Sequence, residues 1–173
     1  YYFVFPRIQS DERIGTSHRE IDNEQAFIEE VLSKKRVLIT GPYNSGKTIL
    51  LKKLFSHLSG EGYMVLLCDI EIIRGKNPER IIRNCFEEIY GSCPSDFTRF
   101  EQLPKSQKVL IIDDVDQIQQ KSFDKFMSYI DELFGTIIFS SVQTLDMSLV
   151  DRMKALLKAV DSVSRYEILP LFA

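Results

Sequence analysis

The segment Gly41-Pro42-Tyr43-Asn44-Ser45-Gly46-Lys47-Thr48 follows the pattern G-x-x-x-x-G-K-T. Glycines in this pattern let the backbone wrap its N–H groups around a phosphate. The lysine, Lys47, then reaches the β- and γ-phosphates, and the hydroxyl of Thr48 binds Mg²⁺. A chance match is expected in roughly one chain in 200 of this length. We therefore expect these eight residues and the following Ile49 to contact a nucleotide; a glycine-rich turn with an incidental lysine is the alternative.

The residues around this segment have the local structure that the pattern needs. Residues 36–40 form an apolar run that predicts a buried strand, and residues 48–58 carry apolar side chains at helical spacing. Strand, loop and helix in this order are the setting of a P-loop, or Walker A motif, because the helix N-terminus then directs its dipole at the phosphates.

Composition limits the classes of function. The chain has 173 residues, of which 44% are apolar, enough for one globular domain with a core. Its net charge of −3 offers no basic field, so we expect no direct contact with nucleic acid. No run of 18 apolar residues occurs, so no membrane-spanning helix and no membrane partner are expected.

The cysteines and histidines suggest no disulfide framework and no metal cluster. Cys68, Cys85 and Cys93 are odd in number and lack C-x-x-C spacing, which predicts reduced thiols in a cytoplasmic protein. His18 and His57 are far apart and have no ligand pattern, so Mg²⁺ bound with nucleotide is the only ion expected.

Apolar runs alternate with helical patterns along the chain, which predicts an α/β fold with a five-stranded parallel sheet between two layers of helices. The predicted strands are 36–40, 63–70, 108–113, 135–141 and 166–169. Helical patterns occur at 22–33, 77–89, 123–133 and 149–160, and the polar stretch 91–107 is expected to be a long connection. We divide the chain into a lead-in segment, 1–17, and a core, 18–173. Both ends of the chain are expected to have been cut from a longer multidomain protein.

A second motif stands at the end of the third predicted strand, Val109-Leu110-Ile111-Ile112-Asp113-Asp114. A buried strand of this kind, called Walker B, brings a carboxylate to the sheet edge where ligands bind, and we expect Asp113 to hold Mg²⁺ there. A second acid can orient or deprotonate the attacking water, and Asp114 is our candidate. Asp116, and the strand-end acids Asp69 and Glu71, remain alternatives.

The fourth predicted strand ends in Ser140 and Ser141. We expect Ser140 to contact the nucleotide, because a hydroxyl at this edge can sense the γ-phosphate through a hydrogen bond. Simple termination of the strand by serine is the alternative.

The order of these motifs resembles the AAA+/STAND branch of P-loop NTPases. Residues 110–115 resemble the hhhhDDV of NB-ARC-type STAND ATPases, and residues 137–141 stand where that family has a strand ending in Thr-Thr-Arg. Residues 166–171 are similar to its closing Y-x-h-x-P-L, and residues 14–20 to its G-R-E segment. Val142 replaces the arginine of that pattern, and Asp116-Gln117 fits the acidic pair of NACHT domains only in part.

The resemblance implies a sheet ordered 5-1-4-3-2, bound ATP or ADP with Mg²⁺, and slow hydrolysis. It also implies a nucleotide-controlled switch inside a larger signalling or defence protein, with self-association and contacts to other domains. No N-K-x-D motif is present, which favours adenine over guanine.

The alternative to a nucleotide-controlled switch is an AAA+ motor or an initiator or loader ATPase acting on DNA or protein. Initiator-type AAA+ ATPases have a similar layout, and in them an arginine acts on a neighbour's nucleotide; Arg152 and Arg165 are the candidates here. A third hypothesis is a scaffold that binds nucleotide without useful hydrolysis.

Overall fold

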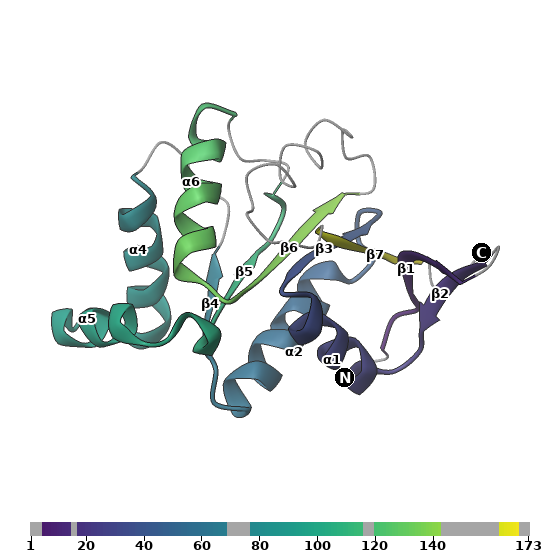
Figure 1. Cartoon of the computed structure of the whole chain (residues 1–173), viewed down its shortest axis with the longest axis horizontal. Coiled ribbons are helices and arrows are strands. Elements are labelled where there is room, and N and C mark those ends of the chain that lie inside the picture. Colours follow the sequence, from purple (N-terminus) through teal and green to yellow (C-terminus); the bar gives the residue numbers. More distant parts are fainter. Residues whose placement is uncertain (1–4, 15–16, 69–76, 116–119, 143–162, 170–173) are drawn as a thin grey trace.

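The computed structural model describes residues 5–14, 17–68, 77–115, 120–142 and 163–169, and its centre is a seven-stranded sheet (Figure 1). The order of strands in the sheet is β2-β1-β7-β3-β6-β5-β4. Their bounds are β1 Ile8–Ile14, β2 Ser17–Ile21, β3 Arg36–Gly41, β4 Met64–Cys68, β5 Lys108–Ile112, β6 Thr136–Val142 and β7 Ser164–Ile168.

The part of the sheet from β7 to β4 is parallel throughout. Numbered among themselves, these strands follow the predicted order 5-1-4-3-2. The prediction of a sheet with five parallel strands and no others is wrong, because β1 pairs antiparallel with both β7 and β2. The strand β1 reads Ile-Gln-Ser-Asp-Glu-Arg-Ile, so it lacks the apolar run by which a buried strand is recognised. The predicted lead-in segment, 1–17, thus contains a strand of the sheet.

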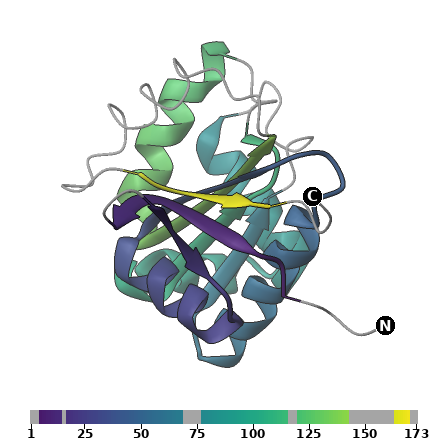
Figure 2. The same ribbon diagram turned by 90° about the vertical axis from the view of Figure 1, so that its right-hand side faces the viewer.

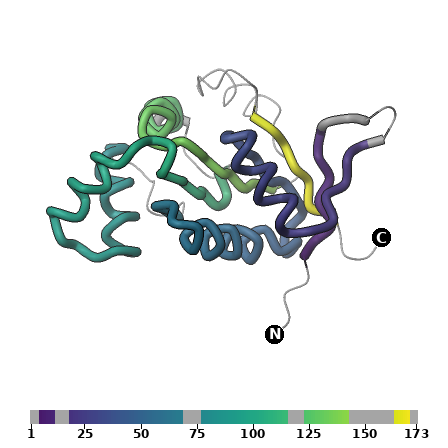
Figure 3. Tube along the Cα trace, turned by 60° about the horizontal axis from the view of Figure 1, so that its bottom comes forward, coloured from purple at the N-terminus to yellow at the C-terminus, as the bar shows by residue number. Residues whose placement is uncertain are grey.

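Helices cover both faces of the sheet. Buried residues of α1 and α2 share one core cluster with β3 and β7, whereas those of α4, α5 and α6 share another on the opposite face. Figures 2 and 3 show α6 and α2 on opposite sides of the strands. The helices are α1 Glu24–Lys34, α2 Lys47–Gly60, α4 Pro78–Tyr90, α5 Pro94–Gln102 and α6 Gln120–Leu133. No helix in the described part of the chain is long and apolar enough to span a bilayer.

The prediction of a long connection over residues 91–107 is wrong, because α5 lies within it. Pro94 occupies the first turn of this helix, where the missing N–H costs nothing. Phe97 and Phe100, three residues apart, are buried and pack on Phe86 with ring centroids 5.5 and 5.2 Å away. The predicted helix at 149–160 lies outside the described residues.

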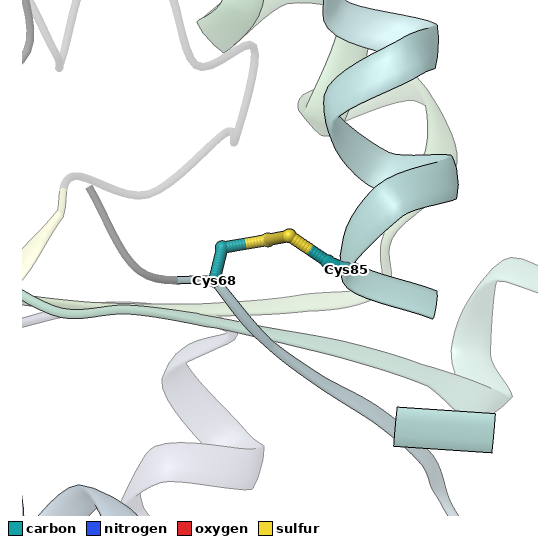
Figure 4. The surroundings of a disulfide bond; sticks show 2 residues. All are labelled: Cys68 and Cys85. Carbon is teal, nitrogen blue, oxygen red and sulfur yellow. A yellow bond between two sulfur atoms is a disulfide. The ribbon is translucent and has the colours of Figure 1, made fainter. Parts of the chain in front are cut away.

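Cys68 and Cys85 form a disulfide, with their Cα atoms 5.7 Å apart (Figure 4). The prediction of reduced thiols at these two positions is wrong. Cys68 is the last residue of β4, and Cys85 lies on the buried face of α4. Packing of the helix on the sheet therefore brings together two side chains whose sequence spacing has no recognisable pattern. Cys93 is free and exposed.

Reduction of this disulfide is expected to lower the free energy of unfolding by about 3 kcal/mol, because the bond closes a loop between residues 17 apart. For a domain of this size, about 3 kcal/mol corresponds to a melting temperature lower by about 6–12 °C. Thermal melts with and without a dithiol reductant check this. The Cys93→Ser variant should show the same decrease in melting temperature on reduction. Equal melting temperatures of the oxidised and reduced proteins would contradict the prediction.

Candidate nucleotide-binding site

The loop between β3 and α2 has the backbone of an anion-binding turn. Asn44 and Gly46 have φ of 61° and 91°, on either side of Ser45. The Ser45 N–H donates to the Pro42 carbonyl at 3.2 Å, and the first helical bond runs from Leu50 N–H to the Gly46 carbonyl at 2.9 Å. The helix α2 therefore begins directly after a left-handed glycine, and a helix N-terminus that follows such a turn favours a bound phosphate.

The loop is tightly folded at its start. A Cβ atom at Gly41 would lie 2.7 Å from the Ser45 hydroxyl and 3.2 Å from the Ile168 side chain, so a larger residue there would force both neighbours to shift. The Ser45 hydroxyl is buried and has no hydrogen-bond partner among the described residues. A buried hydroxyl without a hydrogen-bond partner destabilises the fold. A hydrogen bond from this hydroxyl to an anionic oxygen would remove that destabilisation. The loop therefore fits a phosphate group.

Lys47 lies over this loop. The residue is only 7% exposed, and its Nζ donates to the carbonyls of Gly41 at 3.0 Å and Pro42 at 2.9 Å. An ammonium group has three donors, so a third remains for a phosphate oxygen. The two loop carbonyls thus hold the lysine cation beside the backbone that would bind the phosphates.

The two sequence motifs meet at the carboxyl edge of the parallel strands. The Thr48 hydroxyl, in the first turn of α2, donates to Asp113 Oδ2 at 2.7 Å. The other carboxylate oxygen, Oδ1, accepts a short hydrogen bond from the Ser140 hydroxyl. This meeting follows from the sheet register, because Ile112 pairs with Phe139 and the next residue on each strand is Asp113 and Ser140. Hydroxyl and carboxylate oxygens are ligands that Mg²⁺ prefers, so the pair Thr48 and Asp113 fits that ion.

Asp114 is held by its backbone. Its φ is 53°, in the left-handed region that Asp adopts more readily than most residues, and its N–H donates to the Ser140 hydroxyl at 3.0 Å. A single serine on β6 therefore contacts both acids. Strained backbone of this kind is enriched at functional sites. Ser141, in contrast, donates to the Val142 carbonyl at 3.3 Å.

A pocket extends from these acids toward the edge strand β4. Its lining residues are Thr48, Leu51, Lys52, Leu67, Cys68, Glu88, Asp113 and Asp114. Glu88 of α4 and the α2 residues Leu51 and Lys52 were not among the predicted site residues. Leu51 and Lys52 did carry a signal, because they lie three and four residues after Thr48 and so on the same face of α2.

The other candidate residues lie apart from the pocket or outside the described residues. Tyr43 and Ile49 are at the surface of the loop and of α2, with 79% and 57% of their area exposed. Arg165, on β7, donates from Nε to the Thr40 hydroxyl at 3.4 Å and lies 3.9 Å from the Asp11 carboxylate. The candidates that the structure does not describe are Asp69, Glu71, Asp116 and Arg152.

Comparison with known proteins places the chain in a family. Residues 37–165 match the model of the "ATPase family associated with various cellular activities (AAA)". No curated protein matches the chain.

Three solved structures illustrate the similarity in fold. AMPPCP-bound DnaA from Aquifex aeolicus has 18% identity and a TM-score of 0.52 over 84% of this chain and 43% of that one. The DnaC helicase loader has 14% identity and a TM-score of 0.52 over 84% and 85%. Drosophila ORC bound to AT-rich DNA and Cdc6 has 8% identity and a TM-score of 0.54 over 84% and 28%. The chain thus spans less than half the length of the DnaA chain.

The expectation that nucleic acid is excluded as a partner is wrong. Its basis was the net charge of −3, yet a domain with the same fold occurs in an ORC structure bound to DNA. Net charge averages the whole surface, whereas binding to phosphates depends on where a few cationic side chains lie. The net charge therefore leaves nucleic acid open as a partner.

Proposed function

The chain belongs to the AAA family of ATPases, and we propose that it is the nucleotide-binding core of an initiator or loader ATPase that acts on DNA or on a DNA-handling protein. The observation that carries the nucleotide site is the 2.7 Å contact between Thr48 and Asp113, which joins two motifs 65 residues apart. The resemblance in fold to DnaA, DnaC and ORC supports the initiator or loader type.

The residues of the site have separate roles in this proposal. The backbone N–H groups of residues 43–48 and the Lys47 ammonium bind the phosphates, and Lys47 neutralises charge that develops during transfer. Thr48 and Asp113 would hold Mg²⁺, which when bound neutralises charge on the phosphate oxygens. Asp114 orients the attacking water and accepts its proton. Ser140 fixes Asp113 and the backbone of Asp114 through its hydroxyl.

A nucleotide-controlled switch of the STAND type is the second candidate. It is favoured by the Asp113-Asp114-Val115 sequence at the end of β5, which resembles the NB-ARC pattern. The two candidates differ in their use of nucleotide. A switch retains ADP through purification and turns over rarely, whereas a loader exchanges nucleotide and responds to DNA.

The coupling between nucleotide and DNA tests the proposal. We expect the chain to bind labelled duplex or single-stranded DNA at least about fivefold more tightly with ATP·Mg²⁺ than with ADP·Mg²⁺, the lower end of ordinary coupling between two sites. Fluorescence anisotropy at one fixed salt concentration measures this, because affinity for DNA depends strongly on salt.

Lys47→Ala is the matched control for this experiment. It should lose the difference between the nucleotides while keeping whatever affinity for DNA the nucleotide-free protein has. Failure to bind DNA in any nucleotide state, together with ADP retained in equal amount to protein, would contradict the loader proposal and support the switch.

A further inference from the structure

The disulfide lies beside the nucleotide pocket. Cys68 ends β4 and lines the same pocket as Thr48 and Asp113, while Cys85 belongs to the middle of α4 (Figure 4). Both cysteines are fully buried. The bond therefore links one wall of the pocket to α4, a helix that contains none of the predicted site residues.

The position of Cys68 connects this wall to the acids. In the parallel ladder, Cys68 is the partner of Ile112, and Ile112 directly precedes Asp113. Among the described strands, β4 lies at the edge of the sheet and pairs with β5 alone. An edge strand opens more easily than a central one, since fewer backbone bonds hold it. A change at Cys68 therefore acts on the strand end that lies next to the Mg²⁺ candidate.

The helix α4 is attached to β4 at a second point. The Tyr90 hydroxyl donates to the Val65 carbonyl at 2.9 Å, and burial, the larger effect, raises the pKa of this phenol. Tyr90 thus holds the C-terminal end of α4 on the outer edge of the strand. The disulfide adds a covalent link at the carboxyl end of β4, where Cys68 lines the pocket.

We propose that Cys68 and Cys85 form a site of reversible thiol–disulfide exchange, whose oxidised form holds the β4 wall of the pocket in the arrangement that binds nucleotide. This inference rests on the nucleotide binding proposed above. The reductant is a dithiol. One of its thiolates attacks a sulfur of the bond and forms a mixed disulfide, and its second thiolate then displaces the protein sulfur. The dithiol loses two electrons and two protons, and Cys68 and Cys85 gain them as two thiols.

Bound nucleotide should slow reduction of the disulfide, and reduction should weaken the binding of nucleotide. The two sulfur atoms are buried, so a dithiol reaches them only when α4 and the end of β4 separate locally. A nucleotide that needs the closed arrangement lowers the population of the open one. Because the bond is proposed to hold that closed arrangement, its loss should also weaken nucleotide binding. A bond that only stabilises the fold would leave the Kd for nucleotide unchanged, even if nucleotide slowed its reduction.

The test compares the oxidised and the dithiothreitol-reduced chain. A thiol assay on the unfolded protein establishes the two states: among the three cysteines, the oxidised form should have one free thiol and the reduced form three. Calorimetry with ATP·Mg²⁺ should then give a Kd at least about fivefold higher for the reduced protein. Saturating ATP·Mg²⁺ should slow the reduction by dithiothreitol at least about fivefold as well.

Two variants serve as controls. Cys93→Ser should keep the full response, whereas Cys85→Ser should bind ATP·Mg²⁺ like the reduced protein and ignore dithiothreitol. If Cys85→Ser does not fold, the comparison of the two states of the unmodified chain still decides. Equal Kd values and equal reduction rates would overturn the inference, as would three free thiols that persist after treatment with oxidised glutathione. Absence of ATP binding in both states would instead contradict the proposed function, and the inference with it.

Discussion

Lys47→Ala is expected to weaken binding of ATP·Mg²⁺ at least tenfold. The lysine Nζ lies between the Gly41 and Pro42 carbonyls at 3.0 and 2.9 Å, in position to add a bond to a phosphate. A hydrogen bond between charged groups contributes about 1.5–3 kcal/mol, which corresponds to at least a tenfold change in Kd. The substitution also removes the brace across the loop, so the backbone N–H groups should lose some of their alignment.

Isothermal calorimetry measures this change, with circular dichroism to show that the variant is folded. Lys53→Ala is the matched control, because Lys53 is an exposed lysine on the same helix and does not line the pocket. It should leave the Kd unchanged. A folded Lys47→Ala variant with the Kd of the unmodified protein would remove the basis for assigning residues 41–48 as the phosphate loop.

Asp114→Asn is expected to stop hydrolysis while nucleotide binding is retained. Loss of a general base lowers a rate by about 10²–10⁴-fold. The hydrogen bond to Ser140 comes from the backbone N–H of Asp114, so the substitution leaves that contact in place. A phosphate-release assay beside calorimetry separates the rate from the affinity.

Asp113→Asn provides the comparison, because its carboxylate accepts bonds from Thr48 and Ser140. This variant should raise the Mg²⁺ concentration needed for binding rather than affect the rate alone. If Asp116→Asn abolishes turnover and Asp114→Asn does not, Asp114 is not the base and the NACHT-like alternative gains support.

The turn between β3 and α2 and the parallel part of the sheet could be predicted because their signals are local or periodic. The G-x-x-x-x-G-K-T pattern fixes the turn between β3 and α2, and the apolar runs of β3, β5 and β6 mark buried strands. Once the strand order is known, the register itself brings Asp113 and Ser140 together. That contact could be expected from the two strand ends, although its form, a serine bonded to both acids, could not.

The features that were missed depend on contacts between distant residues. The strand β1 has polar residues at most positions and forms because β7 offers an edge for it to pair with. The disulfide forms because α4 packs on β4, and the spacing of Cys68 and Cys85 carries no trace of this. The net charge was misleading about nucleic acid for a different reason. A sum over the whole chain does not describe the electrostatic field at one part of the surface.

Hydrolysis of ATP by the unmodified chain, measured as phosphate release with and without DNA, tests the central claim most directly. The claim of an initiator or loader ATPase predicts a slow rate in the absence of DNA, well below about one turnover per second. We expect the chain to be monomeric in dilute solution and so to lack an arginine supplied by a second subunit. The claim also predicts an increase in this rate when DNA is added, and loss of the increase in Asp114→Asn. A rate that is fast, independent of protein concentration and indifferent to DNA would contradict the account.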